Sequence, residues 1–213
     1  MVSCPQVSPP PPAGLILASA SPRRRELLAQ LAMPCTIIPA NIDESVLPGE
    51  EPWAYTRRVA YAKSQHVARQ FPTAVVLGAD SVVVLEQQIL GKPRDIEEAR
   101  QMLTRLSGRT HTVLTGLAVL HQARHFVCLD VVSTLVRFRP LSPSAIAHYI
   151  ATGEPMDKAG AYAIQGAAAA FVESWEGCYT NVVGLPLRRT VALLQAAGLS
   201  VPIWPERSAQ SAS

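Results

Sequence analysis

The chain has few cysteines, few aromatic residues, little charge and no long apolar run. Of its 213 residues, 4 are cysteines, 6% are aromatic and 16% are charged. The cysteines stand singly, without a CxxC pair, which argues against a disulfide framework or a zinc site and favours reduced thiols in a cytoplasmic protein. The apolar stretch 13–20 is too short to span a bilayer and has no basic residue before it. We therefore predict neither a signal peptide nor a membrane partner.

The excess of positive charge is also small. The 19 Lys and Arg and 16 Asp and Glu residues leave a formal net charge of +3, whereas nucleic-acid-binding proteins usually cluster many more cations on one face. We therefore expect no nucleic-acid partner. A Walker A loop, a GxGxxG turn and a nucleophile elbow are absent too. Their absence argues against a P-loop nucleotidase, a dinucleotide oxidoreductase and a Ser-His-Asp hydrolase.

What the chain does have is enough apolar material for one sizeable core. Hydrophobic residues make up 48% of the sequence, so a soluble α/β domain is expected. We place this single domain at residues 14–200. Residues 1–13, which are rich in proline, are predicted to be a disordered leader, and residues 201–213 a loose C-terminal tail.

Hydrophobic periodicity and turn residues predict alternating strands and helices. We expect strands at 15–17, 37–38, 74–77, 81–85, 111–120, 126–138, 167–172 and 179–183. Helices are expected to begin near residues 22, 52, 96, 143 and 187. Parallel and antiparallel signals are mixed, which predicts a twisted mixed β-sheet flanked by helices.

The turn from Ser19 to Arg24 has the character of a phosphate site. A helix that begins with Ser21 at its N-cap directs free N–H groups and the positive end of its dipole at what precedes it, and Arg23 and Arg24 add two guanidinium groups. The alternative is that these arginines are only solvated, since cations at a helix N-terminus oppose the dipole. The turn alone leaves both interpretations open.

Carboxylates and lysines elsewhere suit the same kind of ligand. Asp80 follows a strand and a glycine, where a carboxylate is exposed at the rim of an α/β active site or caps its own turn. Asp43 and Glu44 lie in a loop and offer oxygen ligands to a hard cation such as Mg²⁺, although such a pair is usually plain surface. Three lysines, each either a phosphate ligand or an ordinary solvated side chain, are Lys63, Lys92 and Lys158.

Eight sequence blocks, in the same order along the chain, closely resemble the Maf family. They run from residue 15 to about 194 and comprise LASASPRR (17–24), GADS (78–81), GKP (91–93), LSG (106–108) with His111, FRPL (138–141), GEPMDKAGAY (153–162), IQG (164–166) and VGLP (183–186). The resemblance implies a Maf/ITPase-like α/β fold with two lobes around a central cleft.

The resemblance also implies an enzyme. Its relatives are metal-dependent pyrophosphatases, using Mg²⁺, Mn²⁺ or Co²⁺, that cleave a nucleoside triphosphate between the α and β phosphates. The DKAGAY and IQG blocks resemble the branch that acts on dTTP and UTP, and modified pyrimidine triphosphates remain open as substrates. A homodimer is implied as well. The alternative is a nucleotide-sensing regulator of cell division or septum formation.

Four residue roles carry over by position in the blocks, and the others follow from the chemistry that the resemblance implies. Asp80 corresponds to the proton acceptor, and Glu44 and Asp80 would hold the divalent cation together with the triphosphate. The positions that correspond to residues for substrate choice are Arg23, Ser81 and Gln165. The Gln165 amide can pair with the O4 and N3–H edge of uracil or thymine. Ser81 stands where threonine is common in this branch. In the same chemistry, the side chains that would bind the phosphate oxygens are Ser19, Arg24, Lys63, Lys92 and Lys158.

Overall fold

The computed structural model describes residues 14–202, so the predicted leader and residues 203–213 of the predicted tail lie outside the described residues. A mixed sheet in the order β2-β1-β3-β5-β6-β7, with β4 paired to β3, runs through the molecule. β1 is parallel to β2 and β3, and the other pairs are antiparallel. The strands are β1 (Leu15–Leu17), β2 (Cys35–Ile37), β3 (Val75–Leu85), β4 (Gln88–Leu90), β5 (Thr110–His121), β6 (Phe126–Phe138) and β7 (Val172–Glu176).

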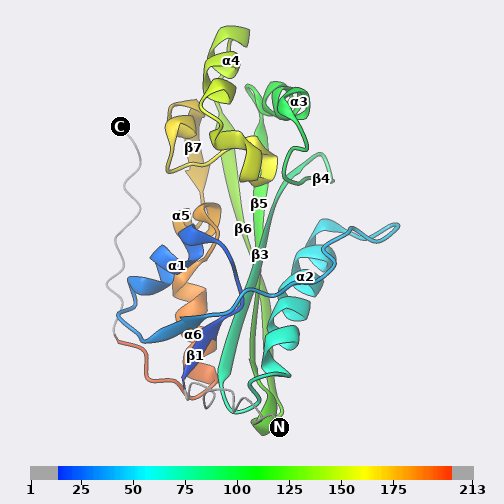
Figure 1. The fold of residues 1–213 in the computed structure, drawn as a ribbon. Helices are drawn as coiled ribbons and strands as arrows, with labels where there is room; N and C mark the ends of the chain where they lie inside the picture. The colour runs from blue at the N-terminus through cyan, green and yellow to red at the C-terminus, as the bar shows by residue number, and fades with distance from the viewer. Residues whose placement is uncertain (1–13, 203–213) are drawn as a thin grey trace, which may run out of the picture.

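Helices flank both faces of this sheet, which confirms the predicted fold class (Figure 1). α2 lies on one side of the long strands, and α1, α5 and α6 on the other. The six α-helices are α1 (Pro22–Ala29), α2 (Pro52–Ala68), α3 (Ile96–Leu106), α4 (Pro143–Ala151), α5 (Tyr179–Val183) and α6 (Leu187–Ala196). Four short 3₁₀ helices complete the described chain: η1 (Gln122–Arg124), η2 (Glu154–Asp157), η3 (Ala159–Ala161) and η4 (Ala167–Phe171).

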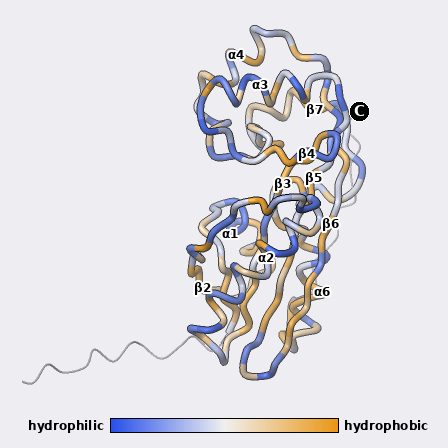
Figure 2. The backbone as a smooth tube through the Cα atoms, turned by 90° about the vertical axis from the view of Figure 1, so that its right-hand side faces the viewer, coloured by the Kyte–Doolittle hydropathy of each residue, from blue (hydrophilic) through white to orange (hydrophobic). Residues whose placement is uncertain are grey.

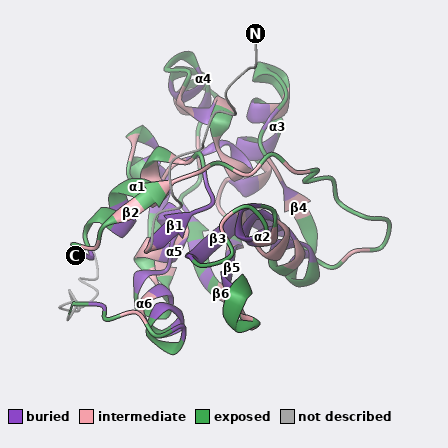
Figure 3. Cartoon of the chain, turned by 60° about the horizontal axis from the view of Figure 1, so that its bottom comes forward, coloured by how far each residue is buried: buried purple, intermediate pink, exposed green. Residues whose placement is uncertain are grey.

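Three long strands connect two lobes. In Figure 2, α3, α4, β4 and β7 form one lobe and α1, α2, α6 and β2 the other, with β3, β5 and β6 passing between them. Apolar residues follow these strands (Figure 2). The buried residues gather on β3 and β5 and on the inner sides of the helices (Figure 3), whereas most of β6 is intermediate or exposed. Burial of this apolar surface is the main favourable contribution to folding.

Local capping explains where several helices begin. The Ser21 side chain accepts a hydrogen bond from the Arg24 N–H, and Pro22 occupies the first turn. Asp95 and Ser142 cap α3 and α4 in the same way. These side chains satisfy N–H groups that have no partner inside the helix. The predicted helix starts near residues 22, 96 and 143 are therefore confirmed.

Two predicted strands are wrong. Residues 167–171 form η4, in keeping with the helix preference of four consecutive alanines, and the strand follows at β7, which pairs with β6. Residues 179–183 are rich in β-branched side chains but form α5. The buried Asn181 side chain anchors this helix by donating to the Val113 carbonyl and to Thr134 Oγ1. Tertiary contacts thus override local strand propensity here.

β3 is one continuous strand, so Asp80 does not lie at a strand end as predicted. The glycine before it, Gly78, is a contact with α2 and not a break in the strand: a Cβ at this position would lie 2.3 Å from Ser64 Oγ. A Cβ on Gly116, the partner of Asp80 on β5, would lie 2.3 Å from the Thr56 carbonyl oxygen. The two glycines therefore allow α2 to pack closely on the sheet beside Asp80.

The described cysteines, Cys35, Cys128 and Cys178, are free thiols, and Cys4 lies outside the described residues. Within residues 14–202, no helix is long and apolar enough to cross a membrane.

Acid is expected to destabilise the protein through His111. The buried ring hydrogen bonds to Tyr162 Oη through Nε2 (2.8 Å) and packs edge-on against Phe138, and burial lowers the pKa of His111 to about 4. Because the unfolded chain binds this proton at a higher pH than the folded protein, stability is lost as the pH falls from the ordinary histidine pKa towards 4. The expected loss is about 3 kcal/mol.

Denaturant unfolding at about pH 7 and about pH 4 measures this loss. His111→Gln keeps a polar partner for Tyr162 but has no titrating ring, so its unfolding free energy should depend less on pH. The same acid sensitivity in both proteins would contradict the assignment.

Candidate active site

A gap in the sheet positions the candidate site. β1 pairs with β3 only as far as Leu17, opposite Leu77, and β4 begins to pair with β3 at Val83. Between these points, no strand of the described chain pairs with this edge of β3. Asp80 and Ser81 lie in this stretch, and since successive side chains of a strand point to opposite faces, they reach into the gap from both faces.

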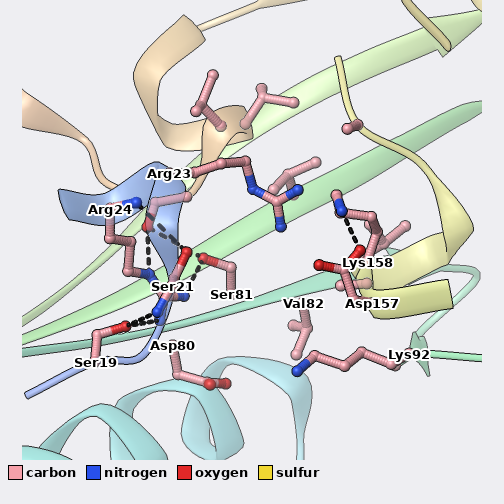
Figure 4. A pocket seen from close by; sticks show the side chains of 18 of the residues that line it. Ser19, Ser21, Arg23, Arg24, Asp80, Ser81, Val82, Lys92, Asp157 and Lys158 are labelled. Atoms are coloured by element: carbon pink, nitrogen blue, oxygen red, sulfur yellow. Dashed lines mark hydrogen bonds and ion pairs between the residues drawn. The ribbon is translucent and has the colours of Figure 1, made fainter. Parts of the chain in front are cut away.

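The gap opens into a pocket of about 650 Å³. All ten side chains that the sequence analysis assigned to the site line it, although they come from distant parts of the chain. Figure 4 labels several of them. They are Ser19, Arg23, Arg24, Glu44, Lys63, Asp80, Ser81, Lys92, Lys158 and Gln165. Apolar side chains, among them Ile89 and Val182, line other parts of the pocket. A charged region and an apolar region together suit a ligand with an anionic end and a ring.

Asp80 lies at the base of this pocket beside a lysine. The Asp80 carboxylate is buried, and Lys63 Nζ lies 2.8 Å from its Oδ1 and 2.9 Å from Glu44 Oε2. Burial raises the pKa of Asp80, while the charges of Lys63 and Arg24 oppose that rise. A carboxylate whose basicity is increased by burial is a suitable proton acceptor.

The Arg24 guanidinium takes the place of a neighbouring strand at the open edge. Its Nη1 donates to the Ala79 carbonyl (2.8 Å), its Nη2 to Ser81 Oγ (3.0 Å) and its Nε to the Gly184 carbonyl (2.8 Å). Nη1 also lies 3.4 Å from Ser19 Oγ. Burial lowers the pKa of Arg24, and the negative charges of Asp80 and Glu44 act in the opposite direction. Most of the donors of this side chain therefore hold the pocket wall together.

Other polar groups in the pocket are not engaged in this way. Figure 4 shows Arg23 and Lys92 directed into the pocket. Within residues 14–202, neither of them nor the exposed Gln165 has a hydrogen-bond or ion-pair partner. Lys158 forms an ion pair with its neighbour Asp157. The pocket thus combines a fixed network around Asp80 and Arg24 with donors that are available to a ligand.

The carboxylates suit only a cation that the ligand helps to hold. Within residues 14–202, no group of three His, Cys, Asp or Glu side chains is placed to bind a metal ion. Glu44 and Asp80 both face Lys63, whereas Asp43 accepts hydrogen bonds from Ser45 and is not part of the pocket lining. Mg²⁺ is commonly held by one or two carboxylates together with substrate phosphates and water. The chain supplies such a pair of carboxylates.

Most of the chain is similar to proteins of one known family. The model of the family described as Maf-like protein matches residues 14–197, nearly all of the described chain. The chain belongs to the Maf family. A relative from Myxococcus xanthus (strain DK1622), named dTTP/UTP pyrophosphatase, is 56% identical over 188 residues, which cover 88% of this chain and 94% of the relative.

A second Maf relative bearing the same name comes from Anaeromyxobacter sp. (strain Fw109-5). It is 54% identical over 191 residues, covering 88% of this chain and 91% of the relative. Among solved structures, the Staphylococcus aureus Ham1 protein aligns with a TM-score of 0.49 and 12% identity, covering 86% of this chain and 97% of that chain.

The sequence analysis did not identify the residues that support the pocket-lining side chains Ser81 and Arg24. Thr115 Oγ1 lies 2.8 Å from Ser81 Oγ and 3.2 Å from the Asn181 carbonyl, and the Gly184 carbonyl accepts from Arg24. Gly184 has a φ of 126°, a conformation that favours glycine. The VGLP block contains Gly184, but its pattern does not indicate that a backbone carbonyl serves Arg24.

Proposed function

We propose that this Maf protein hydrolyses dTTP and UTP to the nucleoside monophosphate and pyrophosphate. The observation that carries the proposal is the buried Asp80 carboxylate at the base of a pocket into which Arg23 and Lys92 project without protein partners. Relatives more than 50% identical bear the name dTTP/UTP pyrophosphatase. A triphosphate supplies the negative charge that these cations would otherwise lack.

In this proposal, Asp80 accepts the proton of the water that attacks the α phosphorus. Lys63 holds the Asp80 carboxylate in place and, with Lys92 and Lys158, offsets the charge of the phosphate oxygens. Arg24 has four hydrogen-bond contacts with protein acceptors out of the five N–H groups of a guanidinium. One remains for phosphate. Ser19 Oγ accepts from Ser21 N and Arg24, so its own O–H is available to donate to a phosphate oxygen.

Glu44 and Asp80 are the residues that would hold a divalent cation, Mg²⁺, Mn²⁺ or Co²⁺, together with the triphosphate. Such a cation, when bound, neutralises phosphate charge and makes a bound water more acidic. Lys63 Nζ now contacts both carboxylates, which limits the repulsion between them.

Base selection is proposed to depend on three further residues of the pocket. The Gln165 amide offers one donor and one acceptor to the O4 and N3–H edge of uracil or thymine. Arg23 and Ser81 are the other residues proposed to act on substrate choice. Ser81 Oγ is already bound to Thr115 and Arg24, so its effect on the ligand passes through the position of Arg24.

A pyrophosphate-release assay over all common nucleoside triphosphates, with Mg²⁺, Mn²⁺ and Co²⁺ in turn, tests the proposal. We expect dTTP and UTP to be the preferred substrates. Gln165→Ala should lower kcat/KM for them about tenfold, the order of magnitude that one or two hydrogen bonds to the base supply. Absence of pyrophosphate release from dTTP, UTP and modified pyrimidine triphosphates with every metal would overturn it. The homodimer and the cytoplasmic location stay predictions, which sedimentation and cell fractionation test.

A further inference from the structure

Gln165 lies in a tight turn whose two ends are held by side chains outside the pocket. In this segment, residues 163–167, the Gly166 N–H donates to the Ala163 carbonyl (3.0 Å). At one end the Ala163 N–H donates to Tyr149 Oη (3.3 Å), and at the other the Ala167 N–H donates to Glu154 Oε2 (3.2 Å). We call residues 163–167 the Gln165 turn.

The two anchors are joined to each other. Tyr149 Oη donates to Glu154 Oε1 (2.9 Å), so a single carboxylate serves both ends of the Gln165 turn. Tyr149 is buried, and this burial raises the pKa of its hydroxyl. The hydrogen bond to Glu154 raises the pKa further. The phenol therefore keeps its proton and remains the donor, and Glu154 remains the acceptor.

Gly166 leaves room for this carboxylate. A Cβ at position 166 would lie 2.1 Å from Glu154 Oε1 and 2.4 Å from Oε2. The carboxylate thus lies directly against the α-carbon that follows Gln165. An alanine at this position would displace the end of a flexible side chain and leave the backbone in place.

We propose that Tyr149 and Glu154 are positioning residues that set the pyrimidine selectivity of the enzyme by holding the Gln165 turn. This inference rests on the proposed function. Neither residue lines the pocket, whereas Ala163, Ile164 and Gln165 do. Their effect on the base therefore passes through the backbone that carries Gln165.

The chemistry of the amide explains why positioning matters. A glutamine amide rotated by 180° exchanges its donor and its acceptor, so the same side chain can serve uracil or, once rotated, cytosine. Pairing with the O4 and N3–H edge of uracil therefore requires the Gln165 backbone to place the amide at that edge, whereas cytosine does not pair with the amide in this orientation and gains nothing from the placement. A Gln165 turn tied at both ends fixes the backbone position from which the side chain reaches the base.

The experiment compares kcat/KM for UTP with kcat/KM for CTP, using pyrophosphate release. In Glu154→Gln, one acceptor oxygen is lost; in Tyr149→Phe, one hydroxyl; and in Gly166→Ala, the carboxylate is displaced. We expect each variant to lower the ratio of kcat/KM for UTP to kcat/KM for CTP about tenfold. The value for UTP should fall, and the value for CTP should stay the same. The matched control is Glu97→Gln, which alters an exposed ion pair with Arg100 on α3 and should leave the ratio unchanged.

A double-mutant cycle tests whether the effect passes through Gln165. Adding Glu154→Gln to Gln165→Ala should not lower the ratio further, because the residue being positioned is already gone. Additive losses would overturn the inference, as would equal losses for UTP and CTP in the single variant. If Glu154→Gln fails to fold, Tyr149→Phe carries the same cycle. An inactive wild-type protein overturns the proposed function as well, whereas an active wild type with unchanged selectivity in the variants overturns this inference alone.

Discussion

Asp80→Asn is expected to lower kcat for pyrophosphate release about a thousandfold, the range that a general base supplies. The asparagine amide has nearly the same shape but cannot accept the proton of the attacking water. Because burial raises the pKa of Asp80, removing the charge relieves a desolvation cost, and Lys63 keeps Glu44 as a partner at 2.9 Å. Loss of the ion pair between Lys63 and Asp80 opposes this gain in stability. The melting temperature should therefore move by no more than about 5 °C.

Steady-state kinetics and thermal unfolding of the same preparation test this prediction. A folded Asp80→Asn protein with more than about a tenth of wild-type kcat would contradict the role of Asp80 as base. The same variant also separates the two functions that the sequence left open. An effect on cell division that persists unchanged in Asp80→Asn would favour a nucleotide-sensing regulator over the enzyme.

Arg24→Ala is expected to destabilise the protein by about 3 kcal/mol and to lower kcat/KM about a hundredfold. The substitution leaves the Ala79 and Gly184 carbonyls without the donor they have now. It also frees Ser81, which accepts from Arg24 Nη2. Arg24→Lys should be nearly as damaging, since one ammonium group does not reproduce the separate donors of a guanidinium.

The neighbouring arginine is the matched control. Arg23 points into the pocket, and no described residue bonds to its guanidinium. Arg23→Ala should therefore change the free energy of unfolding by less than about 0.5 kcal/mol while raising KM or altering selectivity. Denaturant unfolding and kinetics of both variants distinguish them. Equal destabilisation by the two substitutions, or full function in Arg24→Lys, would contradict this division.

Much of the site was predictable because the Maf blocks are contiguous and ordered. The serines and arginines of 19–24, the acid in GADS and the amide in IQG are each recognisable within a few residues. All ten predicted side chains line one pocket. Their roles stay proposals. The helix starts at Ser21, Asp95 and Ser142 were equally local, since a capping side chain acts within three residues of its own position.

The errors arose where a remote partner decides the local structure. Residues 179–183 carry strand-forming side chains, but Asn181 reaches β5 and β6, and the segment forms α5. Asp80 was placed at a strand end because Gly78 resembled a break. The glycine serves the packing of α2 instead. In both cases the deciding contact lies far away in the sequence.

By itself, the sequence determined the family blocks, most strands and helices, and which side chains are chemically suited to a triphosphate. Only the tertiary structure decided that Arg24 is bound to the pocket wall while Arg23 is available to a ligand, and that Tyr149 and Glu154 hold the Gln165 turn. Adjacent arginines in one helix turn have the same local pattern. They differ because Arg24 bonds to the Ala79 carbonyl at the open edge of β3, whereas Arg23 projects into the pocket without a partner among the described residues. That edge exists only once β1 and β4 have paired on either side of it.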